Sequence, residues 1–231
     1  MSISEKRKTD PQFMERFEHF AFDEVISEKD QSLDTPTRWL AIIATLIGCG
    51  GQEAYRDLLP KALDDGLNPV AIKETVYQSV DYLGMGRMWP FLAITNEIFS
   101  SKIIPVASYG EATTTEENRL EKGAEAQAEI FGEHMKDAWK AGHINRWLAA
   151  NCFGDYYTRT GLDLAQREMI TFCFLAAQGG CEPQLIAHAK GNMNMGNDAD
   201  FLKRVVSQCL PYIGYPRSLN AITCIEKASK E

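Results

Sequence analysis

The chain contains one stretch of sequence twice. The segment LDTPTRWLAIIATLIGCGGQEAYRDLLPKALDDG, which begins at Leu33, aligns with LDLAQREMITFCFLAAQGGCEPQLIAHAKGNMNMG, which begins at Leu162. Further on, QSVDYLGMGR from Gln78 aligns with QCLPYIGYPR from Gln208, at an offset that differs by one inserted residue. Agreement in order, spacing and residue type at this many positions indicates a duplicated structural unit.

Both copies show the hydrophobic period of α-helices. Apolar residues recur at helical spacing in RWLAIIATLIGCG, PVAIKETVYQSVDYL and ADFLKRVVSQCLPYI, and no convincing alternating strand run occurs. Gly66 and Gly196 follow expected helix ends, and Gly142 is expected to close one long charged helix, RLEKGAEAQAEIFGEHMKDAWKAG. We therefore predict an all-α fold built from a duplicated helical bundle unit.

One segment interrupts the helical pattern. SKIIPVASYGEATTTEEN contains Pro105, Gly110 and a threonine run, which are typical of a linker. Its end, TTTEEN, also has the pattern of a helix cap. We expect the first copy in residues 1–105 and the second copy in residues 111–231.

The polar residues of the second copy have no counterparts in the first. The second copy carries Glu168, Cys181 and His188. The equivalent positions of the first copy hold Trp39, Gln52 and Leu59. A structural requirement alone would tend to keep similar residues in both copies. We therefore predict a specialised site in the second copy and a scaffold role, with a degenerate site, for the first.

Glu168 lies in REMITFCFLAAQ, a helix apolar enough to be buried, and a buried carboxylate needs a partner. If this helix packs antiparallel to the next one across the Gly179–Gly180 turn, Glu168 faces His188. Such a pair would orient an imidazole that titrates near neutral pH and would supply a proton relay. The alternative is a core histidine that is bonded to a backbone carbonyl.

Cys181 follows two glycines and is expected to open a helix, where the amide dipoles favour a thiolate and lower the thiol pKa. The alternative is a small apolar residue at a helix–helix contact. The neighbouring Glu182 and the absence of a nearby cation favour that alternative. Cys181, Gln184 and His188 have spacings that place them along one face of the helix.

Three further polar residues of the second copy are shared with the first, namely Arg167, Arg217 and Tyr212. Their equivalents in the first copy are Arg38, Arg87 and Tyr82. Residues present in both copies favour structural roles, such as ion pairs or locks at helix ends, and Tyr82 is assigned such a role. An arginine can also anchor a substrate carboxylate through its fork of donors.

Composition narrows the possible partners and the compartment. The 231-residue chain has a formal net charge of −8 and no basic stripe, which argues against nucleic acid and anionic membranes as partners. The N-terminal MSISEKRKTD lacks the apolar stretch of a secretory signal, and no apolar run reaches membrane-spanning length. The six cysteines show no CxxC and no zinc-type spacing. We therefore expect free thiols in the cytoplasm and no bound metal or cofactor.

Three stretches of the chain resemble the carboxymuconolactone decarboxylase family and the related alkyl hydroperoxidase D group: NCFGDYYTRTGLDLAQREM, GGCEPQLIAHAKGNMNMG and PYIGYPRSLNAI. RLEKGAEAQAEIFG is similar to a helix that often precedes them. The resemblance implies an alkyl hydroperoxidase D-like, all-helical unit in tandem form. It also implies a homo-oligomer, with a trimer of two-repeat chains favoured.

The hydroperoxidase relatives use a Glu, a CxxC pair and a His in a thiol relay. Glu168, Cys181 and His188 match three of those positions, but Gln184 replaces the second cysteine. The pattern of a polar residue followed by a histidine is more similar to the decarboxylase branch.

The sequence therefore predicts a cofactor-free enzyme, similar to carboxymuconolactone decarboxylase, that acts on a small carboxylated lactone or ring compound. His188 is the expected proton donor and Glu168 its orienting partner. The expected substrate-binding residues are Gln184, Tyr212, Arg217 and Arg167, with one of the two arginines as the carboxylate anchor. The alternatives are a thiol-dependent, peroxiredoxin-like peroxidase that uses Cys181, and a non-catalytic ligand-binding oligomer.

Overall fold

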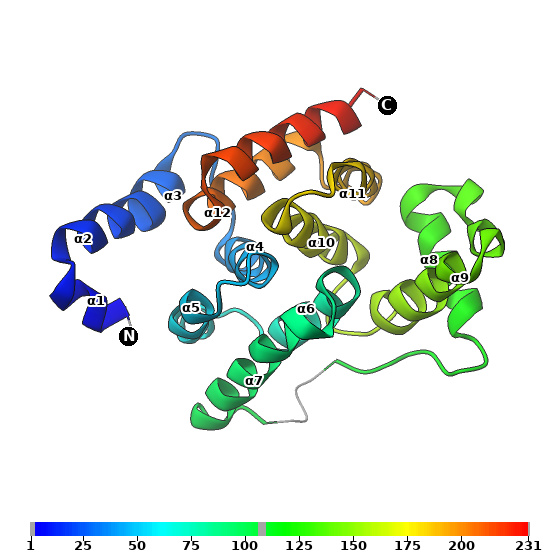
Figure 1. Ribbon diagram of the computed structural model, residues 1–231, viewed down its shortest axis with the longest axis horizontal. Coiled ribbons are helices and arrows are strands. Elements are labelled where there is room, and N and C mark those ends of the chain that lie inside the picture. The colour runs from blue at the N-terminus through cyan, green and yellow to red at the C-terminus, as the bar shows by residue number, and fades with distance from the viewer. Residues whose placement is uncertain (1–2, 106–109, 231) are drawn as a thin grey trace.

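The computed structural model describes residues 3–105 and 110–230 and is built from helices, with no strand in these ranges (Figure 1). The expected all-α fold is confirmed. None of the described helices is both long enough and apolar enough to cross a membrane.

The first copy follows a short leading helix, α1 (Ile3–Thr9). Its elements are α2 (Pro11–His19), the π-helix η1 (Phe20–Glu24), α3 (Val25–Ser27), α4 (Thr35–Gly48), α5 (Gln52–Asp64), α6 (Pro69–Leu83) and α7 (Met85–Ser101).

The second copy follows α8 (Arg119–Phe131) and two 3-10 turns, η3 (Glu133–Met135) and η4 (Ala138–Ala141). Its elements are α9 (His143–Trp147), the π-helix η5 (Leu148–Tyr157), α10 (Leu164–Gln178), α11 (Glu182–Asn194) and α12 (Ala199–Ala228).

Apart from the short α3, which has no counterpart in the second copy, the elements of the two copies correspond in order. Each copy has a π-helix before its first long helix, and each has a glycine with positive φ before its last helical stretch. Gly84 (φ 77°) separates α6 from α7, and Gly214 (φ 76°, ψ 170°) breaks α12 at the equivalent place. The break redirects the chain without a long loop, so the last two helical stretches of each copy meet at an angle.

Aspartate caps start the central helix of each copy. The Asp34 carboxylate accepts a hydrogen bond from the backbone N–H of Thr37, and that of Asp163 accepts one from the N–H of Gln166. The Gln166 side chain accepts one from the Asp163 N–H in return, which completes a capping box. The helices α4 and α10 that begin here pack against each other at the centre of the molecule (Figure 1).

The contact between α4 and α10 requires a small residue. A Cβ atom on Gly48 would lie 2.8 Å from Ala177 Cβ and 2.9 Å from the Phe174 carbonyl oxygen. Glycine at this position therefore lets the two helix backbones approach closely, and the two copies share one continuous hydrophobic core.

Equivalent glutamines tie each copy to the other. The Gln78 amide, on α6, donates to the Arg167 carbonyl oxygen (3.0 Å) and to Thr171 Oγ1 (2.9 Å) in α10. The Gln208 amide, on α12, donates to the backbone carbonyls of Val25 (3.3 Å) and Gln31 (3.1 Å) in the first copy. The duplicated units are therefore interleaved rather than separate.

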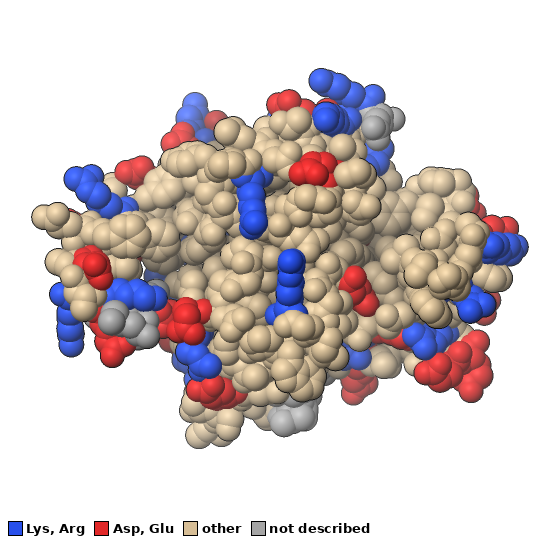
Figure 2. Space-filling model, viewed as in Figure 1, with Lys and Arg blue, Asp and Glu red and all other residues tan. Residues whose placement is uncertain are grey.

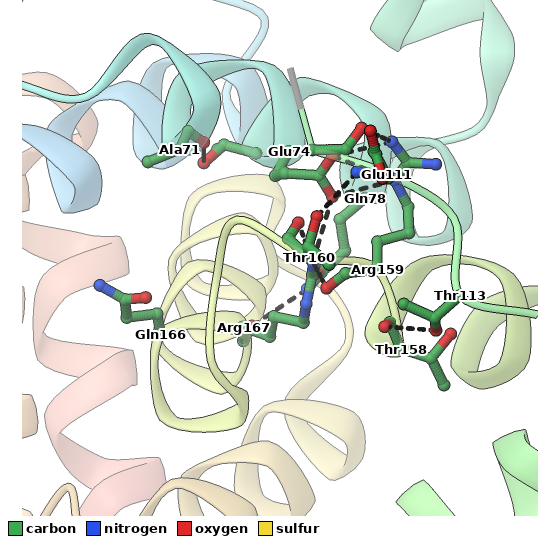
Figure 3. A network of polar contacts seen from close by, with 12 residues as sticks. Ala71, Glu74, Gln78, Glu111, Thr113, Thr158, Arg159, Thr160, Gln166 and Arg167 are labelled. Atoms are coloured by element: carbon green, nitrogen blue, oxygen red, sulfur yellow. Dashed lines mark hydrogen bonds and ion pairs between the residues drawn. The ribbon is translucent and has the colours of Figure 1, made fainter. Parts of the chain in front are cut away.

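A buried ion cluster lies where the copies meet, centred on Glu74 of α6 (Figure 3). Its carboxylate pairs with Arg167 (3.1 Å) and Arg159 (2.9 Å), and the Glu74 and Arg167 side chains have 0% exposure. Arg167 also donates to Gln78 Oε1 (2.8 Å) and to the Arg159 carbonyl oxygen (2.8 Å). A Cβ on Gly110 would lie 2.5 Å from Glu74 Oε1, so the linker crosses the cluster at a glycine.

The prediction of one long charged helix that ends at Gly142 is wrong about where the helix ends. It ends at Gly132, whose φ of 106° stops α8, and Gly142 instead follows the 3-10 turn η4. The threonine run also differs from a simple cap. The Thr113 and Thr114 hydroxyls donate to the carbonyls of Thr158 and Gly154 and so attach the linker to η5.

Charged side chains on the face shown in Figure 2 gather toward the two ends of the molecule, with acidic and basic residues interspersed. The middle of that face is mostly uncharged.

We expect Glu74→Gln to lower the free energy of unfolding by about 3–5 kcal/mol, because it leaves buried guanidinium groups without a counter-charge. Chemical denaturation measures this difference. Arg56→Ala breaks an exposed ion pair with Glu97 and serves as the control, with an expected loss below about 1 kcal/mol. Equal losses in the two variants would contradict the role of the Glu74 cluster.

Candidate active site

Glu168 and His188 form a buried pair between α10 and α11. The two helices run antiparallel around Gly179 (φ 69°) and Gly180 (φ 72°), and His188 Nδ1 lies 2.8 Å from Glu168 Oε2. Glu168 has 0% exposure and His188 has 8%. The pairing expected from the sequence is therefore present in the structure, and the alternative of a backbone-bonded core histidine does not describe it.

A glycine makes this pairing possible. A Cβ on Gly191 would lie 2.5 Å from Glu168 Oε2, so any larger residue would displace the carboxylate. Asn192 fixes the backbone beside it by donating to the carbonyls of both Glu168 and His188, at 2.8 Å each. The space at Gly191 and the hydrogen bonds of Asn192 together fix the position of the Glu168 carboxylate beside His188.

Two tyrosines extend the pair toward the first copy. Tyr157 of η5 donates to Glu168 Oε1 (2.9 Å), and its hydroxyl lies 2.7 Å from that of Tyr82 in α6. Burial and the neighbouring Glu168 carboxylate raise the pKa of both phenols well above the ordinary value, so both remain neutral hydroxyls. Tyr82, to which the sequence assigned a structural role, therefore belongs to the surroundings of the site.

Aromatic rings surround the imidazole. The ring of Tyr82 packs edge-on against His188 with centroids 5.5 Å apart, and Phe131 of α8 does so at 5.3 Å. These rings restrict the imidazole to one orientation, with Nδ1 toward Glu168. The other ring nitrogen, Nε2, is the one available to a ligand.

The pair opens on a cavity of about 740 Å³. Its walls include apolar side chains of α8, η5 and α10, among them Phe131, Leu148, Phe153 and Leu175. The titratable side chains that line it are Asp81, Tyr82, His134, Cys181, His188 and Lys190. A cavity with apolar walls and a few convergent polar groups is the usual form of a small-molecule site.

The face of Cys181, Gln184 and His188 lines this cavity, as the helical spacing predicted. Cys181 immediately precedes α11, and its thiol hydrogen-bonds with the Leu175 carbonyl (3.5 Å) and the Gln178 amide (3.6 Å). Burial raises the pKa of the Cys181 thiol, the Gln178 hydrogen bond opposes this, and Glu182 adds to it. The raised pKa favours the thiol form, in agreement with the alternative of a small packing residue that the sequence favoured.

Three of the predicted substrate-binding residues lie away from the cavity. Arg167 is taken up by the Glu74 cluster. Arg217 is exposed at the start of the second half of α12, donates to the Ala177 carbonyl and borders a separate pocket of about 270 Å³. Tyr212 packs against Phe17 of the first copy, at the position equivalent to that of Tyr82.

The positions equivalent to the buried pair are filled in the first copy. Trp39 and Leu59 both have 0% exposure, and the Trp39 indole N–H donates to Asp65 (2.9 Å). These side chains occupy the space that the Glu168–His188 pair occupies in the second copy.

The cavity holds functional candidates that the sequence did not reveal. Lys190 is a cation on its wall, and His134, Gln127, Asp81 and Tyr82 contribute polar groups. Lys190 is only two positions from His188 in α11, so a helical projection places it off the face of Cys181, Gln184 and His188 and would not have found it. Asp81 and Tyr82 come from the other copy, and no sequence period connects them to the site.

The described residues contain no group of three or more His, Cys, Asp or Glu side chains arranged to hold a metal ion.

These features define a helical two-repeat protein with one buried Glu–His pair at a small-molecule cavity. The family model of the carboxymuconolactone decarboxylases matches residues 11–97 and 143–227, and the chain belongs to this family. The two matched segments correspond to the two copies, whereas α8 lies between them.

The chain is also similar to the 4-carboxymuconolactone decarboxylase of Acinetobacter baylyi (strain ATCC 33305 / BD413 / ADP1). The two are 27% identical over 130 residues, which cover 50% of this chain and 90% of the relative.

Asp81 provides a test of the electrostatics of this site. Burial, with a further contribution from Asp155, raises the pKa of its carboxyl from 3.8 to about 7. The folded protein therefore holds this proton more tightly than the unfolded chain does. The stability contributed by Asp81 is complete below about pH 4 and is lost as the pH rises to about 7.

We expect Asp81→Asn to be more stable than the wild type by on the order of 2 kcal/mol at pH 8, after allowance for partial exposure, with the difference shrinking toward pH 4. Thermal or chemical unfolding at several pH values measures it. Asp200→Asn, at an exposed side chain, is the control. A difference that is independent of pH would contradict the assignment.

Proposed function

We propose that the protein is a decarboxylase that needs no metal or redox cofactor and acts on a small carboxylated lactone or ring compound at the His188 cavity. The observation that carries the proposal is the buried Glu168–His188 pair, at 2.8 Å, at the wall of a cavity large enough for such a substrate. Membership of the carboxymuconolactone decarboxylase family supports the reaction class.

The chemistry follows from the geometry of the pair. When the substrate carboxylate leaves as carbon dioxide, the electrons of the broken C–C bond move into the ring and onto the unsaturated lactone carbonyl. A proton must then be added to the ring carbon. Glu168 binds Nδ1 of His188 and stabilises the protonated imidazole, so that Nε2 delivers the proton and is later reprotonated from solvent.

The anchor for the substrate carboxylate differs from the one expected from the sequence. Neither Arg167 nor Arg217 lines the cavity, whereas Lys190 and His134 do. In a chain of net charge −8, a local cation is needed to attract an anionic substrate, and Lys190 supplies it. Gln184, which also lines the cavity, is placed to bind a substrate oxygen.

A thiol peroxidase centred on Cys181 is the second candidate, because Cys181 lines the same cavity. The raised thiol pKa weighs against it, since the thiolate is the nucleophile in such chemistry. Gln184 also stands where a second cysteine would complete a CxxC pair. A non-catalytic ligand-binding oligomer stays a third prediction. The trimer of two-repeat chains and the cytoplasmic location also remain predictions.

We expect wild-type protein to release carbon dioxide from 4-carboxymuconolactone, and His188→Ala to reduce kcat by about 10²–10⁴, the usual contribution of a general acid. Glu168→Gln should lower kcat with a smaller change in KM, because it acts through the imidazole. His143→Ala, at an exposed histidine of α9, is the matched control. Unchanged turnover in His188→Ala would refute the proposed role.

Alkylation separates the thiol candidate from the decarboxylase. We expect iodoacetamide to modify Cys181 slowly at neutral pH, with a rate that rises only above the ordinary pKa of a thiol, and prior peroxide to leave that rate unchanged. Peptide mapping identifies the site, and Cys181→Ser is the control. Fast alkylation at pH 7 that peroxide blocks would make the thiol reaction the better account.

A further inference from the structure

A second pocket lies between the two copies, apart from the His188 cavity. Its volume is about 270 Å³, and both copies line it: the end of α4 and the starts of α5 and α7 from the first, and the end of α10 and the middle of α12 from the second. Two of its side chains, Arg87 and Arg217, hold equivalent positions in the two copies, and so do Cys49 and Gln178. The duplication therefore brings equivalent side chains together around one pocket.

The pocket carries positive charge. Arg87 and Arg217 are the charged residues among the described side chains that line it, and neither Asp nor Glu is among them. Within the described part of the chain, neither guanidinium takes part in an ion pair. The carbonyl ends of α4 and α10 meet the pocket, but each helix end carries only about half a negative charge, so they do not cancel two full positive charges. A chain of net charge −8 thus has an electropositive pocket between its copies.

Both arginines keep hydrogen-bond donors for a ligand. Nη1 of Arg87 donates to Gln178 Oε1 (3.0 Å), and Nη1 of Arg217 donates to the Ala177 carbonyl oxygen. Both contacts are made at the end of α10, so a lock at a helix end accounts for one N–H of each residue. A guanidinium has five N–H groups, and both side chains are exposed, so a solute can reach the remaining donors.

The start of α7 adds a donor from the backbone. Gly86 lies in the first turn of this 17-residue helix and lines the pocket. The first N–H groups of an α-helix have no acceptor within the helix and carry the positive end of its dipole. A Cβ on Gly86 would meet no atom within 4 Å, so the backbone here is open to a ligand. Pro216, at the equivalent position of the second copy, has no N–H to donate.

We propose that this pocket binds a phosphate group between Arg87 and Arg217, either as inorganic phosphate or as part of a small phosphomonoester. Guanidinium groups bind phosphate through pairs of parallel hydrogen bonds, and the start of a helix favours the same anion. A tetrahedral anion has oxygens in enough directions to accept from both arginines and from Gly86. A pocket of about 270 Å³ suits a small anion. The inference concerns a pocket other than the His188 cavity and does not depend on the proposed function.

Isothermal titration calorimetry of the full-length protein with inorganic phosphate, near neutral pH and at low ionic strength, tests the proposal. We expect the wild type to bind one phosphate per chain. Arg87→Gln and Arg217→Gln should each weaken binding by about tenfold or more, because each removes a charged, forked donor. Arg87→Lys keeps the charge without the fork, so its affinity should lie between those of the wild type and Arg87→Gln.

Two variants serve as matched controls, because each lowers the net charge by the same amount as the loss of one pocket arginine. Lys190→Gln removes a cation from the His188 cavity, and Arg7→Gln removes an exposed arginine that pairs with Glu18 (2.8 Å). Both should bind phosphate as the wild type does. Glycerol 3-phosphate and malonate are titrated in parallel. Tighter binding of glycerol 3-phosphate than of inorganic phosphate would identify a phosphomonoester as the ligand, and weaker binding would identify the free ion.

A measurement on the wild type alone keeps the proposal testable if the arginine variants fold poorly. The Nε–Hε signals of Arg87 and Arg217 in ¹⁵N NMR spectra should shift when inorganic phosphate is added. The corresponding signal of Arg7 should stay where it is.

Several results would overturn the proposal. The wild type might bind neither inorganic phosphate nor glycerol 3-phosphate, or Arg87→Gln and Arg217→Gln might bind them as the wild type does. An equal loss of affinity in Lys190→Gln would place the anion in the His188 cavity. Tighter binding of malonate than of both phosphate compounds would contradict phosphate as the recognised group. A wild type that ignores phosphate, together with a lower molecular mass of Arg87→Gln in light scattering, would show that the arginines join two copies of the chain.

Discussion

The site depends on one buried carboxylate, that of Glu168. With no exposure to water, an ionised carboxylate is stable only if hydrogen-bond donors replace the water that it has lost. His188 Nδ1 and the Tyr157 hydroxyl do so, at 2.8 Å and 2.9 Å. This requirement explains the glycine at position 191, which makes room for the carboxylate, and the Gly179–Gly180 turn, which brings α10 and α11 together. The pair that satisfies the carboxylate is also the pair that can move a proton.

The two copies share the residues that join them but differ at the positions of the Glu–His pair. Both copies keep residues that join them, such as Gln78 and Gln208, which each donate across the interface, although to partners that are not equivalent. The positions of the Glu–His pair are kept in the second copy, whereas Trp39 and Leu59 fill them in the first. The first copy nevertheless completes the cavity by supplying residues of α6. The interleaved packing explains why one chain needs two copies to build a single site.

The sequence predicted the helical duplication and the Glu168–His188 contact because both follow from local patterns. Helical period defined the elements, and a carboxylate in an apolar helix had to have a partner nearby. It did not reveal Asp81, because α6 is far from α11 in the sequence. It did not reveal Tyr157 either, because the contact with Glu168 joins two elements, η5 and α10, that have no shared period.

Arg167, which the sequence offered as a substrate-binding residue, has a structural role for a physical reason. Arg167 has the chemistry of a carboxylate anchor, and it does bind a carboxylate, but that of Glu74 inside the protein. Its match in the first copy, Arg38, had already favoured a structural role. A sequence gives the chemistry of a side chain, whereas only the packing determines whether the partner is internal or a substrate.

The most direct test of the account is an NMR titration of protein labelled with ¹⁵N in its four histidines, using a saturated analogue of 4-carboxymuconolactone that cannot lose carbon dioxide readily. The account predicts that the ring nitrogens of His188 shift, together with those of His134 on the same cavity wall, while His19 and His143 stay unchanged. An absence of shifts at His188, or shifts confined to His19 and His143, would show that the cavity beside the buried pair is not where such a substrate binds.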